Sequence, residues 1–455
     1  MQEKILGTEK ISKLFIKFAI PAIIGMVISS MQTIIDGIFV GRFVGENALA
    51  SVNVARPFMD LIFGPTFIIS IGAMSYMGRA LGAKQVEKGQ SIFRTATLLG
   101  VSLGLFIALI GTTFHRQLAE LLGASPLLLN FVSTYIKNIA LFAPFIITMY
   151  LFGFTNRLLG KPRVYLISSI CSIIVNISLD YLFVKELQMG IQGAALATGI
   201  AFVVAFVICA IPLLDKRSTV NFYKGHWTPS LIGQMLYNGS SEGIVSLSSA
   251  LTVYLFNRTF MAFAGESGVA AYTTISYIAY FGLMMVFGIS DGIASIISYN
   301  YGKRQFDRIK EIMKLALRTS AIIGLVLVAV MNFSAEPLIQ LFIKDNSSIV
   351  AMAAKGAALY SVGFLITGYN IISSSYFTAI GNARASIFIA LSRGLVGITL
   401  GILILPNFLG INGVWLTVPL AELLAFILIQ FLKKREPTAT LTLKQIDQYS
   451  AKKTA

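Results

Sequence analysis

Long apolar segments separated by short polar ones follow one another along the whole chain. The first, residues 15–43, holds about 20 apolar positions in near-continuous succession, enough for a helix to cross a bilayer. Such segments are too long for barrel strands, and only helices or closed barrels span lipid with their backbone groups paired. The pattern therefore predicts an all-α polytopic membrane protein.

Twelve segments of this kind can be placed, each close to the roughly 20 residues that a spanning helix needs. They cover residues 15–41, 54–78, 94–113, 129–156, 164–184, 193–214, 231–257, 269–299, 316–334, 350–379, 385–405 and 412–432. Several contain helix breakers, such as Pro144 and Gly363. A membrane bundle tolerates these residues because neighbouring groups satisfy the freed backbone.

The composition agrees with a membrane protein. Of the 455 residues, 56% are hydrophobic and 12% are charged, and the mean hydropathy is +0.78, whereas ordinary soluble chains carry roughly 25% charged residues. The net charge of +16 does not point to nucleic acid, because no basic domain interleaved with aromatic residues carries it. Residues 1–13 are polar, so we expect no cleavable signal peptide.

The sequence shows no pattern typical of a metal, nucleophile or phosphate site. His115 and His226 fall in predicted loops far apart, without ligand spacing. Cys171 and Cys209 lie inside apolar segments, which favours small core residues over a disulfide. Because a Walker-type loop is also missing, we expect no cofactor, no direct use of ATP and no enzyme activity.

Most of the 36 Lys and Arg residues fall on one side of the predicted bundle. This side collects the N-terminal segment, the loops after even-numbered spans and the C-terminal segment. Because cytoplasmic loops carry an excess of positive charge, we expect both termini in the cytoplasm. The expected location is the cytoplasmic (inner) membrane of a prokaryote.

The second half of the chain repeats the first at a shift of 220 residues. LGAKQVEK at 81–88 aligns with YGKRQFDR at 301–308, and GIQGAALAT at 190–198 aligns with GINGVWLTV at 410–418. Ordered matches of this kind indicate a duplication. Six spans separate equivalent points, an even number, so both halves insert in the same sense.

A parallel duplication predicts two six-helix lobes related by a pseudo-two-fold axis along the membrane normal, with a central cavity between them. The N-terminal lobe would span residues 1–214 and the C-terminal lobe residues 231–455. A cytoplasmic linker at 215–230 would join them. We expect the chain to work as a monomer.

Two acids of the first half stand inside predicted spans. Asp36 lies late in the first span and Asp180 late in the fifth, with Asn176 four residues earlier on the same helix face. Both spans run outward, so the three residues lie at similar depth. Two neighbouring carboxylates in lipid cannot both stay charged cheaply, which favours proton or cation binding. The alternative is that each acid lies at the outer end of its helix, wetted by water.

Four charged residues lie inside spans of the second half. Glu242 and Asp291 fall toward the cytoplasmic ends of their spans, where either an inward cavity or the membrane interface could hydrate them. Arg393 and Glu422 each lie roughly halfway across neighbouring spans. We expect an ion pair between these two, because an unpaired charge at that depth is costly.

The acid pair of the first half has no counterpart in the second. At the shift of 220, Phe256 takes the place of Asp36, and at the neighbouring shift of 221, Gly401 takes the place of Asp180. Ion coupling should therefore be asymmetric and confined to the first half.

Several motifs resemble the MATE family of multidrug and toxic-compound exporters. They are IPAIIGMVISSMQTIIDGIFVG in the first span, GRALGAKQ and YNYGKRQ in equivalent loops, and LLGKPR before the fifth span. The resemblance covers nearly the whole chain, residues 10–435. It is closest to the branch with two acids in the N-terminal half, the DinF-like proteins and their relatives.

The resemblance implies a cation site in the N-terminal lobe, built from an acid, an Asn-x-x-x-Asp motif and a threonine. These positions fall on Asp36, Asn176, Asp180 and Thr198. The family's bending proline of the first span falls on Pro21. Because another branch of the family uses acids of the C-terminal lobe, secondary candidates remain. They are Glu242, Asp291 and Gln32.

The function indicated by the residues and the resemblance together is secondary active efflux. We expect export of amphipathic, mainly cationic drugs in exchange for H⁺ or Na⁺. One alternative is a flippase for lipid-linked precursors, which should line its cavity with cationic residues, and only Arg393 is a candidate for that role. An integral-membrane enzyme or channel is the alternative from a different class.

Overall fold

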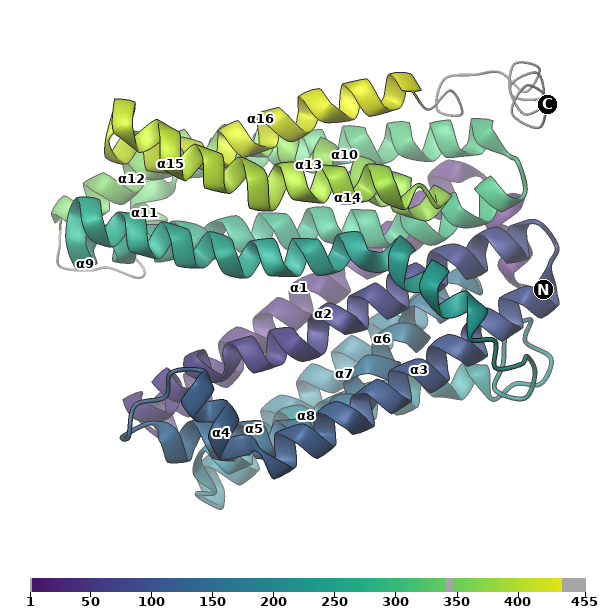
Figure 1. The fold of residues 1–455 in the computed structure, drawn as a ribbon, viewed down its shortest axis with the longest axis horizontal. Helices are drawn as coiled ribbons and strands as arrows, with labels where there is room; N and C mark the ends of the chain where they lie inside the picture. Colours follow the sequence, from purple (N-terminus) through teal and green to yellow (C-terminus); the bar gives the residue numbers. More distant parts are fainter. Residues whose placement is uncertain (1, 341–346, 436–455) are drawn as a thin grey trace.

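The computed structural model describes residues 2–340 and 347–435 as two groups of helices that meet along one seam (Figure 1). The first group, called the N-terminal lobe here, contains α1 (Ile11–Phe43), α2 (Glu46–Gly82), α3 (Val86–Thr113), α4 (His115–Leu121), α5 (Leu129–Ala140), α6 (Ala143–Leu158), α7 (Pro162–Asp180) and α8 (Gly190–Ala210). The second group, the C-terminal lobe, contains α9 (Ser230–Gly302), α10 (Phe306–Phe333), α11 (Ala335–Gln340), α12 (Ser347–Ser361), α13 (Phe364–Ile380), α14 (Ala383–Leu391), α15 (Gly397–Leu409) and α16 (Ile411–Arg435). Four short 3₁₀ or π segments join these helices, namely η1 (Gln2–Gly7), η2 (Tyr181–Glu186), η3 (Ile211–Leu213) and η4 (Ser392–Val396).

The predicted count of twelve spans is confirmed within the described residues. Nine helices there are long and apolar enough to cross a membrane, and two bent pairs raise the number to eleven. Helix α9 supplies two spans rather than one, because its 73 residues would extend about 110 Å in a straight line. It reverses at Gly265, whose φ of 61° and ψ of −151° are not helical.

The bent spans break close to the predicted helix breakers. Helices α5 and α6 meet at 51°, and Pro144 lies in the first turn of α6, where its missing N–H costs nothing. Helices α12 and α13 meet at 48°, with Gly363 immediately before α13. In contrast, α1 runs as one helix through Pro21.

The seam between the lobes is built from close backbone crossings that obey the internal repeat. A Cβ added at Gly72 of α2 would collide with the Met235 carbonyl and lie 3.1 Å from the Gly239 nitrogen of α9. In the equivalent crossing, a Cβ at Gly292 would lie 2.8 Å from the Ala19 Cα of α1. Gly72 and Gly292 are 220 residues apart, as are Ala19 and Gly239.

A second pair of crossings, at the C-terminal ends of α2 and α9, repeats the same relation. Gly82 faces the carbonyl of Tyr299, and Gly302 faces the carbonyl of Arg79. Each residue of the first contact lies 220 positions from its counterpart in the second. The pseudo-two-fold relation predicted from the repeat therefore extends to individual contacts.

In the part of the chain that the structure describes, the lobes pack closely at one end. Figure 1 shows the helices of the two lobes converging toward the end where α1 begins and α16 ends, and diverging toward the turn of α9. One hydrophobic core runs through the seam, whereas a second lies within the C-terminal lobe around Phe256, Phe260 and Trp415. About three helical turns before Gly72 and Gly292, on the same helix faces, Leu61 and Phe281 are 55% and 39% exposed. We call the space between these faces the inter-lobe cleft.

We predict that a methyl group is tolerated at Gly64 but not at Gly72, although both lie within α2. A Cβ at Gly64 meets nothing within 4 Å, so Gly64→Ala should be neutral or slightly stabilising through helix propensity. Gly72→Ala should cost about 1–3 kcal/mol, because it overpacks a backbone contact. Thermal unfolding of the detergent-purified variants measures the difference. Equal melting temperatures would show that the seam is not held by this crossing.

Candidate functional site

Three helices of the N-terminal lobe bring the predicted cation-site residues together. Asn176 and Asp180 lie one turn apart on α7, and Thr198 of α8 donates its hydroxyl to Asp36 of α1 at 3.2 Å. The side chains of Asp180 and Asn176 also face the Asp36 carboxylate. These four residues are the acid site below.

The acid site is enclosed and short of hydrogen bonds. Asn176 and Asp180 are fully buried and Thr198 is 7% exposed, while Asp36 is half-buried. Among the described residues, no hydrogen-bond partner reaches either carboxylate oxygen of Asp180, the Oδ1 atom of Asp36 or the amide of Asn176. Buried unpaired polar atoms cost about 1–3 kcal/mol each, and two facing carboxylates repel. Carboxylate, amide and hydroxyl oxygens converging in this way suit a proton or a hard monovalent cation.

Two residues that the sequence did not single out lie near the acid site. Tyr135 of α5 is buried, and the charges of Asp36 and Asp180 reach its hydroxyl, as does the charge of Arg56 on α2. One tyrosine among 17 in an apolar chain carries no signal that would have identified it. Immediately after Asp180 the chain passes into the π segment η2, a geometry that is frequent at functional sites.

The other N-terminal candidates lie outside this cluster. Gln32 is buried one turn before Asp36, but its side chain is not among those that face the Asp36 carboxylate. Pro21 lies between Ala19 and Ile23, whose backbones would meet a Cβ at Gly292 or Gly288 of α9. The residue that resembles the family's bending point is thus located at the seam.

The equivalent position in the C-terminal lobe is filled by aromatic side chains. Phe256 is fully buried and stacks on Tyr272 with the ring centroids 4.9 Å apart. Phe260 lies between Tyr272 at 5.3 Å and Trp415 at 4.3 Å. Thr417 packs against Gly401, the counterpart of Asp180. The described part of this lobe therefore offers no carboxylate where the N-terminal lobe has two.

The two other acids of the C-terminal lobe meet at the base of the cleft. Glu242 and Asp291, from the two limbs of α9, line a cavity of about 30 Å³ together with Arg393 and residues of α2 and α6. A cavity of this size holds one or two water molecules. Both acids therefore line a small cavity that residues of the two lobes enclose together.

Arg157 of the N-terminal lobe brings a positive charge to the bottom of the cleft, next to Asp291. Its Nη1 atom lies 3.5 Å from Asp291 Oδ2, and its guanidinium stacks 4.8 Å from the Phe154 ring and 4.2 Å from the Tyr165 ring. Residue 157 directly follows the fourth predicted span, 129–156, and would have been expected in a loop. The residue belongs to the last turn of α6 and is 2% exposed.

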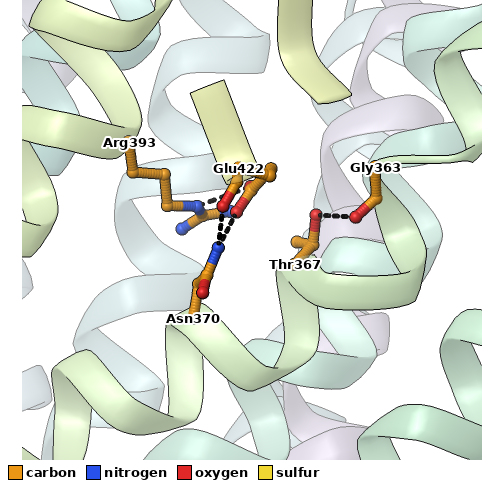
Figure 2. A network of polar contacts seen from close by, with 5 residues as sticks. All are labelled: Gly363, Thr367, Asn370, Arg393 and Glu422. Carbon is orange, nitrogen blue, oxygen red and sulfur yellow. Dashed lines mark hydrogen bonds and ion pairs between the residues drawn. The ribbon is translucent and has the colours of Figure 1, made fainter. Parts of the chain in front are cut away.

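The predicted ion pair between Arg393 and Glu422 is confirmed. Arg393 Nε lies 2.6 Å from Glu422 Oε1 (Figure 2). Asn370 of α13 donates to Glu422 Oε2 at 2.7 Å and to the Glu422 carbonyl at 2.8 Å. Arg393 lies in the π segment η4, so the contacts join three spans. Asn370 was missed because single amides are common in membrane helices.

Comparison with known proteins gives one family. The MatE family model matches residues 21–182 and 243–403, which is more than half of the chain. Multidrug export protein MepA of Staphylococcus haemolyticus is 26% identical over 424 residues, covering 93% of each chain. MepA of Staphylococcus aureus is 25% identical over 429 residues, covering 93% of this chain and 94% of that protein.

Solved structures show the same fold. A MATE protein crystallised in complex with MaL6 superimposes with a TM-score of 0.90 at 23% identity, covering 96% of this chain and 99% of that one. An outward-facing multidrug resistance transporter of the MATE family gives a TM-score of 0.89 at 22% identity, with 96% and 98% covered.

We predict that breaking one side of the Arg393–Glu422 pair harms stability more than removing both sides. Arg393→Met leaves the Glu422 carboxylate buried with Asn370 alone and should cost about 3–5 kcal/mol. The double variant Arg393→Met/Glu422→Leu should cost markedly less, since Asn370 keeps the Glu422 carbonyl as its acceptor. Melting temperatures in detergent rank the variants. A double variant as unstable as the worse single one would contradict the pairing.

Proposed function

Because this chain belongs to the MatE family, we propose that it is a secondary active antiporter that exports amphipathic, mainly cationic organic compounds in exchange for H⁺ or Na⁺. Its staphylococcal relatives are multidrug export proteins. The observation that carries the proposal is the acid site, where buried carboxylate and amide atoms lack partners among the described residues. A proton or cation that binds there would remove this cost.

We place coupling in the N-terminal lobe alone. Asp36, Asn176, Asp180 and Thr198 would hold the ion. The aromatic cluster around Phe256 could not, since it offers no ionisable carboxylate. Two acids in this lobe also favour a place near the DinF-like branch. Glu242, Asp291 and Gln32 are secondary candidates for contact with the ion or the drug.

We further propose that the chain works as a monomer in a prokaryotic cytoplasmic membrane, with both termini in the cytoplasm. The lobes would comprise residues 1–214 and 231–455, with 215–230 as a cytoplasmic linker. Under this topology the inter-lobe cleft opens to the outside, and the seam closes the cytoplasmic side. The exposed cleft walls at Leu61 and Phe281 would then be the route by which drug leaves.

Neutralisation of the acid site is the proposed trigger of release. A neutral pair is cheaper to enclose than a charged one. Protonation or cation binding would let the outer part of α1 repack toward α7 and α8, which narrows the space that drug occupies. Pro21 makes a bend of α1 cheap, because it removes one backbone hydrogen bond. Ion and drug would thus compete for one lobe, and this competition is what antiport requires.

The flippase alternative receives no support from the cleft. Recognition of a lipid-linked phosphate would call for unpaired cations on the cavity wall. Arg393, the one candidate from sequence, is already bound to Glu422 at 2.6 Å. Its charge is therefore compensated within the C-terminal lobe and is not available to bind a phosphate.

We predict that Asp36→Asn and Asp180→Asn each abolish gradient-driven drug efflux while the protein still inserts and folds. Either change removes the carboxylate on which the ion depends. Efflux from vesicles, with a pH gradient and a Na⁺ gradient imposed separately, measures the effect and identifies the coupling ion. Asp215→Asn, in the exposed linker, is the control and should export normally. Normal efflux by both acid-site variants would refute the site.

We also predict that the ion displaces the drug at equilibrium. Drug affinity of the purified protein should fall either on acidification or as Na⁺ is raised, because a neutralised acid site favours the narrowed lobe. Fluorescence titration with a cationic dye measures this, and Asp36→Asn should flatten the dependence. An affinity unaffected by both ions would contradict the competition, though not export itself.

A further inference from the structure

The segment that leads into the C-terminal lobe is docked on the N-terminal lobe. The Gln90 side chain of α3 donates to the Thr219 carbonyl, and Gln90 Oε1 accepts from the Asn221 backbone at 3.4 Å. The ring of Phe222 packs 5.1 Å from that of Phe152. Asn221 is fully buried. Although residues 215–228 connect the lobes, these contacts bind them to the N-terminal lobe.

The segment that leads into the N-terminal lobe is docked on the C-terminal lobe. Arg308 of α10 donates to the carbonyls of Leu6 at 3.1 Å and Glu9 at 2.7 Å. Asn300 of α9 donates to the Leu6 carbonyl at 2.9 Å and accepts from Arg308 Nε at 3.1 Å. The Leu6 side chain is fully buried in the core. Residues 5–9 are therefore held by the opposite half of the molecule.

The two docked segments end at equivalent positions. Residues 5–9 pass into α1 at Lys10, whose ψ of 132° is extended rather than helical. Residues 215–228 pass into α9 at Thr228, whose N–H donates to Thr95 of α3 at 3.1 Å. The Thr228 carbonyl accepts the first hydrogen bond of α9. Thr8 and Thr228 are 220 residues apart, and so are Lys10 and Ser230.

We propose that each docked segment moves with the lobe that binds it, so the lobes rotate about two short junctions, one at Lys10 and one at residues 229–230. This inference rests on the proposed alternation of the transporter between two openings. Rigid-body movement of domains is absorbed by a few residues at the ends of elements, and these junctions are single points between docked chain and helix. The two pivots would lie on the seam side, related by the pseudo-two-fold axis.

The contacts on either side of the junctions favour this division. Release of a docked segment would expose Leu6 or Asn221 and leave the Gln90 and Arg308 side chains without their backbone partners. The seam is different, because backbone crossings at small residues separate without breaking a hydrogen bond. The polar contacts across the seam are side-chain contacts: Ser75 donates to the Thr378 and Ala379 carbonyls at 2.6 and 3.1 Å. Arg79 donates to the Ala379 carbonyl at 3.1 Å, and Arg157 pairs with Asp291 at 3.5 Å. These bonds can be exchanged for water when the seam opens.

Three pairs of cysteines test the inference in the full chain, in a background with Cys171→Ser and Cys209→Ser. Two pairs join a segment to its dock, Ser91→Cys with His226→Cys and Gly7→Cys with Lys303→Cys. The matched control, Ser75→Cys with Ala379→Cys, crosses the seam. Each is bridged with a short bifunctional thiol reagent, and its own unbridged form is the reference.

Bridging the seam should abolish dye efflux, whereas bridging either docked segment should leave efflux within about twofold of the unbridged protein. Loss of efflux on bridging a docked segment, to the extent seen for the seam, would overturn the proposal. If the unbridged protein exported no dye, that result would count against the proposed export function and not against the pivots. The pivots would then be tested by the distances between spin labels.

Spin labels at the same three pairs give that second measurement in lipid nanodiscs, at low and high pH with and without Na⁺. The seam distance should lengthen under at least one condition, while both docking distances stay constant. A docking distance that lengthens with the seam, or a seam that never opens, would refute the pivots.

Discussion

The close approach of helix backbones at the seam is the constraint on which the rest of this structure depends. Because Gly72, Gly82, Gly292 and Gly302 lack side chains, the two lobes meet almost without intervening atoms. The lobes can therefore diverge only away from this contact, which sets where the cleft opens and where its base lies. The paired glycine positions also explain why the duplication remains visible in sequence, since a side chain at any of them would force the lobes apart.

The polar groups are distributed unequally over this symmetrical frame. The acid site lies within one lobe, and its counterpart is the packed cluster of Phe256, Phe260, Tyr272 and Trp415. At the base of the cleft, Arg157 of one lobe meets Asp291 of the other. The backbone contacts of the seam thus follow the repeat, whereas the buried charged groups do not.

Apolar periodicity predicted most of the fold, and one physical reason singled out the two acids of the acid site, whereas Thr198 was named only through the resemblance to the family. A charge inside a long apolar run is expensive, so Asp36, Asp180, Arg393 and Glu422 stand out without any alignment. Their neighbours do not stand out in this way. Asn370 is one amide among many, and Arg157 closes a span, where an arginine ordinarily faces water.

The docked segments could not have been predicted either. Residues 5–9 and 215–228 read as polar connections, and they are held through backbone carbonyls, which leave no trace in side-chain periodicity. The turn of α9 is a similar case. A loop was expected between 257 and 269, but a single residue, Gly265, reverses the helix because it adopts a positive φ.

The aromatic replacement of the second acid pair has an electrical consequence. A transporter with one site, binding one monovalent cation in each cycle, exchanges it for a monocationic drug without moving net charge across the membrane. The membrane potential would then neither drive nor oppose export, and only the concentration ratio of the coupling ion would supply work. A second acid pair in place of Phe256 and its neighbours would have made each cycle electrogenic, at about 2.3 kcal/mol per elementary charge for every 100 mV. Under the proposed coupling, with one monovalent cation bound per cycle, the stacked rings would restrict the protein to the concentration component of the ion gradient.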